Sequence, residues 1–243
     1  MDRIQLESRK GEKGFTLVEL AIVMIIIGLL IVGILKGQEM IANAQVSSTI
    51  TQLKATDAAT STFRDIYNAF PGDMANAATR LRNCNAGNCN NGDGDGRLDI
   101  GVGAANNAAN EGAFFFTQMA AADLISGVDS QTLDIGSVYP SAPVGGGFFA
   151  GHTNPNGGAT SVTSFTGANM RPGHYLVLNG IETAVTNTSG VLNASQAARI
   201  DRKLDDGLPL AGSVQSNANC GTATDYNEDQ PNLLCPIAVR VQG

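Results

Sequence analysis

A single carboxylate, Glu19, lies inside an otherwise apolar segment near the start of the chain. The residues from Leu20 to Leu35 are all apolar or glycine, and a helix over the 21 residues from Phe15 to Leu35 would span about 30 Å, the thickness of a bilayer's hydrocarbon core. A charged side chain there costs on the order of 2–3 kcal/mol on insertion scales, so Glu19 is expected to have a function and a partner. The nearest plausible cation is an α-amino group, if the chain is cut just before Phe15.

A second group of acidic residues lies in an Asn/Gly/Asp loop. Counted from Asn91, oxygen-bearing side chains occupy positions one, three and five and a glycine occupies position six, as in the first half of a calcium-binding loop. Position twelve is Val102 rather than an acid, so Asp99 or Glu111 would have to complete the shell. The loop therefore predicts either a structural Ca²⁺ site or a solvated turn. The candidate ligands are Asn91, Asp93, Asp95, Asp99 and Glu111.

The remaining candidates for chemistry are weak. The acidic group Asp201, Asp205 and Asp206 is interpreted as a helix face and cap rather than a metal site. The glycine run at 145–147 lacks the lysine and helix of a phosphate loop. His152 and His174 are interpreted as strand residues. No catalytic set is present, and we predict that the protein is not an enzyme and requires no cofactor.

The apolar segment is expected to continue as one long helix. The first proline is Pro71, and the interval before it predicts a helix from Phe15 to about Asn68. The alternative is two helices hinged at Lys36–Gly37, where glycine permits a break. Beyond the membrane run, apolar or small residues recur mostly every three or four positions, which indicates an amphipathic face: Val46, Ile50, Leu53, Thr60, Phe63, Tyr67 and Phe70.

The rest of the chain predicts short helices and strands separated by Gly/Asn/Pro turns. A second helix is expected from Glu111 to Ile125, closing at Gly127. A third is expected from Asn193 to Gly207, with Asn193 or Ser195 as its N-cap. The predicted strands are Phe148–His152, Ser161–Thr166, His174–Leu178 and Pro236–Val241.

The residues from Gly14 to Glu19 carry a resemblance to a known family. Gly14-Phe15-Thr16-Leu17-Val18-Glu19, preceded by a short charged leader and followed by an apolar run, resembles the signal of type IV pilins and type II secretion pseudopilins. The resemblance implies that a prepilin peptidase cuts between Gly14 and Phe15 and methylates the new amino group of Phe15. It also implies that Glu19 meets the amine of a neighbouring subunit during assembly, and Thr16 could help to position that amine. The alternative is an uncleaved signal anchor.

The resemblance also implies the fold and the domains. It predicts an α+β architecture in which a long N-terminal helix packs on a globular domain with an antiparallel sheet. The expected parts are a leader at 1–14, a transmembrane half of the helix at 15–37, an amphipathic half at 38–70 and an extracytoplasmic head at 71–243. The turn at Tyr67–Asp73 and the late helix end at Ile200–Gly207 resemble the family more loosely.

Charge and cysteine content fit an exported protein. The basic leader is expected to stay cytoplasmic, which places the head in the periplasm. The net charge of −7 disfavours a nucleic-acid surface, which needs clustered Lys and Arg. Four cysteines allow three pairings, of which the spacing suggests Cys84–Cys89 and Cys220–Cys235. The alternative of free thiols is less common outside the cytoplasm.

Three functions follow from these observations. The first is a structural subunit of a type IV pilus-like filament, a single-pass protein of the bacterial inner membrane before assembly and part of an extracellular pilus afterwards. Its partners would be related subunits, the prepilin peptidase and an inner-membrane assembly platform. The second is a minor pilin or a pseudopilin of a periplasmic pseudopilus. The third is a membrane-anchored calcium-binding or adhesive module that does not polymerise.

Overall fold

The structure is a computed structural model that describes residues 14–84, 87, 89–104, 110–129, 132–154, 162, 165, 170–181, 185–186, 189–230 and 232–241. The leader residues before Gly14 lie outside this range. The chain divides into two compact units, residues 1–43 and 44–243. The longest element, helix α1, contributes residues to both units.

Helix α1 is continuous from Leu17 to Tyr67. The single helix predicted from the sequence is therefore confirmed, and no break occurs at Lys36–Gly37. The helix ends because Asn68 adopts a left-handed conformation with φ of 51°, which asparagine tolerates better than most residues. Its N–H still donates to the carbonyl of Arg64 at 2.8 Å.

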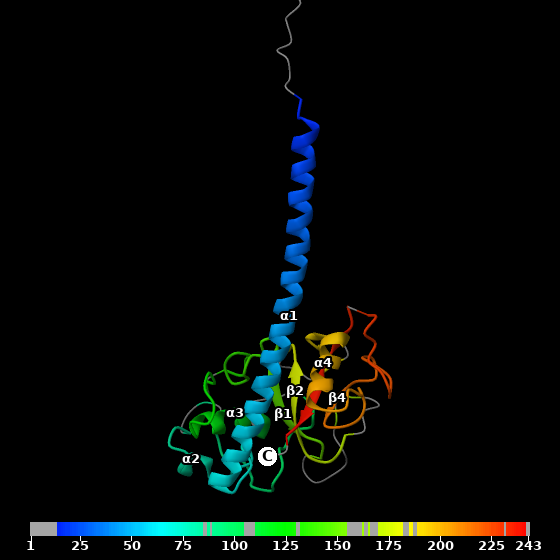
Figure 1. The fold of residues 1–243 in the computed structure, drawn as a ribbon. Helices are drawn as coiled ribbons and strands as arrows, with labels where there is room; N and C mark the ends of the chain where they lie inside the picture. The colour runs from blue at the N-terminus through cyan, green and yellow to red at the C-terminus, as the bar shows by residue number, and fades with distance from the viewer. Residues whose placement is uncertain are drawn as a thin grey trace, which may run out of the picture. The chain divides into compact units, whose positions relative to one another are not determined.

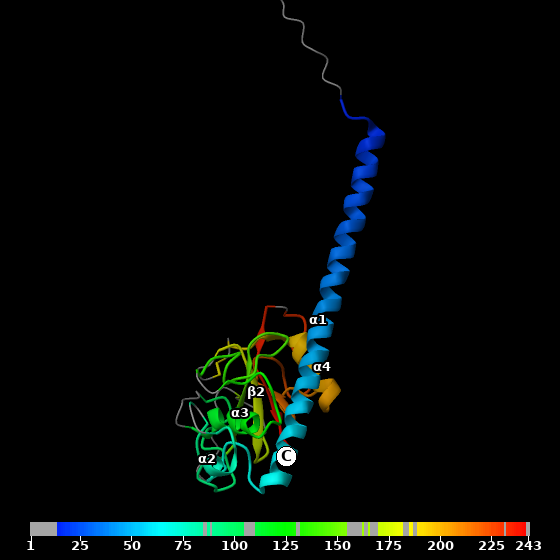
Figure 2. The same cartoon turned by 90° about the vertical axis from the view of Figure 1, so that its left-hand side faces the viewer.

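Within the second unit, α1 contributes one apolar face to the core. Its buried residues recur at steps of three or four, which places them on one side of the helix: Val46, Thr49, Ile50, Leu53, Thr56, Thr60 and Phe63. The threonines add no unpaired hydroxyl, since the Oγ1 atoms of Thr49, Thr56 and Thr60 donate to carbonyls four residues earlier. Figures 1 and 2 show this part of α1 alongside the sheet.

The main sheet has four antiparallel strands in the order β1-β2-β6-β4. The strands are β1 (Gly147–His152), β2 (His174–Asn179), β4 (Val214–Ser216) and β6 (Ile237–Arg240). Strands β3 (Leu192–Asn193) and β5 (Leu234–Cys235) form a second, two-stranded sheet. Every residue of β1 and all but the first of β2 are buried. Because side chains alternate between the two faces of a strand, both faces of this sheet are covered. The α+β architecture is confirmed.

The described residues of the second unit also form three short helices: α2 (Ala77–Arg80), α3 (Glu111–Ala121) and α4 (Ala194–Leu204). Asn193 caps α4 in a reciprocal pair with Gln196, in which each side chain accepts the other residue's backbone N–H. Asn193 is therefore the cap, rather than Ser195. The sequence did not predict α2.

Helix α3 ends earlier than the sequence predicts. The expected end was Ile125, with Gly127 closing the helix, but α3 ends at Ala121. The reason is Asp123, which adopts φ of 58°. The Asp123 N–H donates to the carbonyl of Ala120, and the next N–H, of Leu124, donates to Met119. This is the Schellman arrangement, which usually has glycine at the left-handed position.

The predicted strands at 148–152, 174–178 and 236–241 match β1, β2 and β6 within one or two residues. Of the predicted strand Ser161–Thr166, only residues 162 and 165 are described, so that prediction lies mainly outside the described residues. Val162 forms an isolated bridge with Val102.

Candidate functional site

The first candidate site lies at the start of α1, where Thr16 and Glu19 bond to each other. The backbone N–H and the hydroxyl of Thr16 both donate to Oε2 of Glu19 at 2.9 Å. The N–H of Glu19 donates to Oγ1 of Thr16 at 3.2 Å. This is a capping box, in which two orphan N–H groups of the helix terminus are satisfied reciprocally.

The capping box gives Glu19 a role within its own helix. From the resemblance, Thr16 is expected to help position the amino terminus and Glu19 to meet an amine. The cap is an additional feature, although a Thr followed three residues later by Glu before an apolar run is the local signal for one. Phe15 is 85% exposed. The start of α1 therefore presents an exposed aromatic residue beside a carboxylate that is already bonded on one oxygen.

The helix after this cap is apolar and exposed. Every residue from Leu20 to Leu35 is exposed, and α1 contains an 18-residue window with a mean hydropathy of 3.0, none of it buried. The helix is therefore long and apolar enough to cross a membrane, in which exposed apolar side chains incur no penalty from water.

Comparison with known proteins supports this interpretation. Residues 9–35 match the model of the prokaryotic N-terminal methylation motif. The N-terminal segment is a type IV pilin-like prepilin signal. No curated protein and no solved structure gave a significant match to the chain. The motif and the apolar helix fit a pilin-like or pseudopilin-like protein anchored in the inner membrane, and they suggest a structural protein.

The second unit contains a second candidate site, formed by three carboxylates. Asp73, Asp93 and Glu111 each place an oxygen within 4.8 Å of the others. Asp73 follows the turn after α1, Asp93 lies in the Asn/Gly/Asp loop, and Glu111 begins α3. Asp73 and Glu111 are each only 3% exposed.

Backbone N–H groups of the loop surround these carboxylates. Asp73 accepts from Gly94 at 2.8 Å and from Gly96 at 3.0 Å. Glu111 accepts from Asp93 at 2.8 Å and from Asp99 at 3.0 Å. The two side chains thus hold the loop by its backbone.

Burial makes the charged forms of these acids costly. Burial raises the pKa of Asp73 to about 6, with nearby Asp93 and Asp95 adding to the rise and the two loop N–H groups opposing it. Burial likewise raises the pKa of Glu111 to about 7, with a further contribution from Asp73 and Asp99. Near neutral pH the cluster therefore holds protons more tightly than free carboxylates do.

The structure brings together only part of the predicted calcium ligand set. Asp93 and Glu111 belong to the cluster, and Asp73, which is not among the predicted ligands, is its third member. The side chain of Asn91 accepts from the N–H of Ala78 at 2.9 Å instead. Asp95 accepts from the N–H of Arg97, and Asp99 contacts the cluster through its backbone. Calcium binding stays a prediction.

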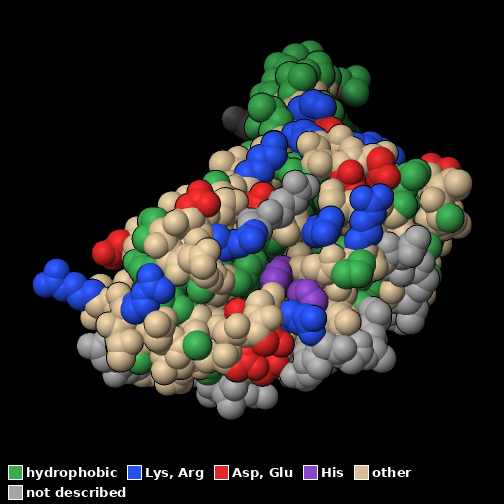
Figure 3. Space-filling model, turned by 90° about the horizontal axis from the view of Figure 1, so that it is seen from below, with side chains coloured by type: hydrophobic (Ala, Val, Ile, Leu, Met, Phe, Trp, Pro, Cys, Tyr) green, Lys and Arg blue, Asp and Glu red, His purple; other side chains and the backbone are tan. Residues whose placement is uncertain are grey.

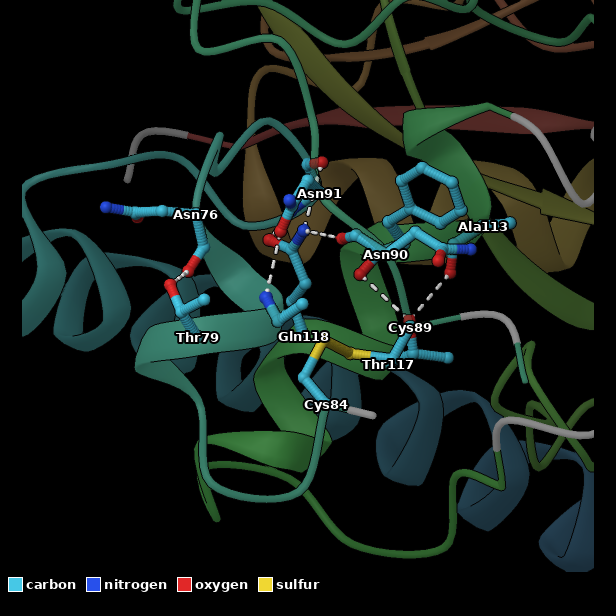
Figure 4. The surroundings of a disulfide bond; sticks show 12 residues. Asn76, Thr79, Cys84, Cys89, Asn90, Asn91, Ala113, Thr117 and Gln118 are labelled. Atoms are coloured by element: carbon cyan, nitrogen blue, oxygen red, sulfur yellow. Dashed lines mark hydrogen bonds between the residues drawn. A yellow bond between two sulfur atoms is a disulfide. The ribbon is translucent and has the colours of Figure 1, made fainter. Parts of the chain in front are cut away.

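A disulfide and a glutamine lie beside this cluster. Cys84 and Cys89 are bonded, and Figure 4 shows their surroundings. The side chain of Gln118, on α3, donates to the carbonyl of Asn90 at 2.8 Å and accepts from the N–H of Gly72 at 2.7 Å. Gln118 thus connects both ends of the segment between α1 and the loop, a role that sequence alone did not reveal.

The other acidic group, Asp201, Asp205 and Asp206, lies at the C-terminal end of α4, and its carboxylates also place oxygens within 4.8 Å of one another. Its interpretation as a helix face and cap rather than a metal site stays a prediction. Asp201, at the end of α4, accepts from the N–H of Gly207 and the hydroxyl of Tyr226. Asp205 accepts from the N–H groups of Ser213 and Val214. Burial raises the pKa of Asp201 to about 6. The second disulfide, Cys220–Cys235, lies in the same part of the head, and both disulfides have the pairing that the spacing suggests.

Proposed function

We propose that the chain is a structural subunit of a type IV pilus-like filament, cut between Gly14 and Phe15 by a prepilin peptidase and polymerised from the inner membrane. The methylation motif at residues 9–35 carries the proposal. The exposed apolar helix that follows supports it, because neighbouring subunits could bury such a surface in a filament.

Glu19 would act in two successive settings. In the isolated subunit one of its oxygens bonds to Thr16, which reduces the cost of placing a carboxylate in lipid. In the filament the carboxylate would pair with the methylated amine of Phe15 of a neighbouring subunit. That pairing brings together two charges that would each be costly alone, and it would set the register between subunits.

The domains follow from the same proposal. Residues 1–14 are the leader, 15–37 cross the membrane, 38–70 form the amphipathic part of the helix, and 71–243 form a head in the periplasm. Pilus subunits and secretion pseudopilins share the signal, so a pseudopilin or minor pilin is the second candidate. A membrane-anchored module that does not polymerise is the third.

Mass spectrometry of the N-terminal peptide from native membranes tests the first step. We expect a peptide that begins at Phe15 and carries one additional methyl group. A chain that begins at or near Met1 would overturn the proposal and leave a plain membrane anchor.

Substitutions of Glu19 test the assembly step and separate its two roles. Glu19→Gln can still form a capping box with Thr16, because Gln serves at this position as well as Glu, but it has no charge. Glu19→Ala loses both. We expect both variants to be processed and neither to yield sheared surface filaments, whereas Glu39→Ala, a carboxylate paired with Lys36 further along α1, should assemble. Normal filaments from Glu19→Gln would show that the cap, and not the ion pair, is what matters.

A further inference from the structure

A polar cleft of about 810 Å³ opens in the second unit where α1 ends. Its lining comes from four parts of the chain: the last turns of α1, the segment that follows it as far as Arg80, Gly94 and Gly96 of the Asn/Gly/Asp loop, and His174 at the start of β2. Figure 3 shows histidine side chains inside a hollow of this face, with Lys and Arg side chains close to it. The volume is in the range of small-molecule binding sites.

One cation of the cleft is already used by the protein. Arg80 donates to the carbonyl of Tyr67 at 3.0 Å, and its guanidinium lies 5.5 Å from the centre of the Tyr67 ring. That carbonyl belongs to the C-terminal end of α1, where the helix dipole is negative and would repel an anion. Arg80 therefore offsets the negative end of this helix, which would otherwise oppose binding of a negative group.

A second cation is available to a ligand. Arg64 is exposed on α1 and lines the cleft, and its guanidinium makes no hydrogen bond or ion pair with any residue that the structure describes. A guanidinium presents its N–H groups as a planar fork that matches a carboxylate in a bidentate way. Arg64 is thus a recognition group without a partner in this part of the chain.

The base of the cleft is aromatic and uncharged. The rings of Phe70 and His174 stack with their centres 3.6 Å apart. Burial, together with His152 and Arg64, lowers the pKa of His174 to about 3, so the imidazole is neutral. Of the two acids that line the cleft, Asp65 and Asp73, the second already accepts two backbone N–H groups. Among the described residues, neither acid forms an ion pair with Arg64.

The rim of the cleft is rich in groups that bond hydroxyls. Asn68 and Asn76 present amides, Asp65 presents a carboxylate, and all three are exposed. Amides, acids and a guanidinium arranged above an aromatic base are suited to sugars, whose hydroxyl groups donate and accept. A peptide strand would need an open sheet edge, but β2 is paired on both sides, by β1 and β6.

We propose that this cleft binds an acidic saccharide, with Arg64 holding the sugar carboxylate and the amides of Asn68 and Asn76 bonding its hydroxyls. The volume accommodates more than one sugar ring. Binding does not depend on polymerisation, so this proposal and the filament proposal can be tested independently.

The test uses the full chain in detergent micelles and two disaccharides that differ only in the groups at C6. Digalacturonate carries a carboxylate on each ring where α-1,4-digalactose carries a hydroxymethyl group. Isothermal titration should show at least tenfold tighter binding of digalacturonate, since a charge-assisted bidentate pair is typically worth a factor of that size. Arg64→Gln should reduce that affinity to the level of the neutral sugar. Arg82→Gln, an exposed arginine that is not among the lining residues, should leave it unchanged.

Each alternative outcome overturns the proposal. Equal binding of both sugars, or no binding of digalacturonate at millimolar concentration, would show that the cleft does not recognise the sugar carboxylate. Binding of acetate as tight as that of digalacturonate would show a site for a simple anion and not a sugar. An unchanged affinity in Arg64→Gln would place the ligand elsewhere. A thermal melt of each variant checks that the head remains folded.

Discussion

In the N-terminal unit the large side chains of α1 are exposed, with Leu17 at 87% and Leu30 at 58%, whereas in the second unit the same helix buries Val46 to 2% and Phe63 to 0%. The backbone is helical throughout. What changes is the side-chain pattern: apolar residues surround the first segment, and they occupy one face of the second. A continuous helix thus has one segment that is apolar enough to cross a membrane and one segment that packs in a protein core.

The largest expected effect that separates the two segments comes from truncating a buried ring. Phe63→Ala should lower the free energy of unfolding of the head by about 3–5 kcal/mol, because it leaves a cavity in the core. Leu30→Ala removes a similar apolar group from the exposed segment and should leave that free energy unchanged in detergent. Chemical denaturation followed by circular dichroism measures both. A head that is equally stable in both variants would contradict the division of α1 into two environments.

A second prediction concerns how the head compensates for its many loops. Replacing Cys220 and Cys235 together by serine should destabilise the head by about 3 kcal/mol, and the same change at Cys84 and Cys89 by about 2 kcal/mol, because the bridges close loops of 15 and 5 residues. Denaturation of each double variant tests the order. If removing Cys84–Cys89 were the more destabilising change, that disulfide would stabilise the head by holding the native carboxylate cluster rather than by restricting the unfolded chain.

The features that sequence predicts well depend only on residues that are close together in the chain. The apolar run, the methylation motif and the N-cap candidate Asn193 are local patterns, and finding them needs no tertiary information. The sequence also places Glu111 with the Asn/Gly/Asp loop, because the loop lacks an acid at its twelfth position.

The parts that sequence misses depend on the fold. Asp73 is 20 residues before Asp93 and looked only like the end of a turn, yet it joins the cluster when α1 and α3 pack. The two- and three-residue strands β3, β4 and β5 are too short to show a period of two. Asp123 ended α3 because it adopts a conformation usually left to glycine, so the glycine four residues later was a misleading signal.

The smallest predicted effect is the loss of folding stability when the carboxyl groups of the cluster lose their protons. Because the pKa values of Asp73 and Glu111 are raised to about 6 and about 7, the folded head binds more protons than the unfolded chain between about pH 4 and pH 7. Its stability should therefore be greatest at or below about pH 4 and fall as the pH rises from there to about 7. After allowance for solvent screening, the loss is about 1–2 kcal/mol per carboxyl.

Calorimetry in EDTA at pH 5 and pH 7.5 measures this loss, and Glu111→Gln, which resembles the protonated acid, should flatten the difference. A head in EDTA that is equally stable, or more stable, at pH 7.5 would contradict the raised pKa values.

Adding calcium tests the cluster further. The exposed side chains of the apolar segment have no oxygen ligands for a cation, whereas the cluster has three carboxylates. If the carboxylates bind Ca²⁺, adding it at pH 7.5 should restore the stability of the wild-type head, because the ion replaces the protons that the cluster has lost. The same addition should have a much weaker effect on Glu111→Gln. An identical response of both proteins would place any bound calcium outside the Asp73–Asp93–Glu111 cluster, and the cluster would then act only as a clamp on the backbone of the loop.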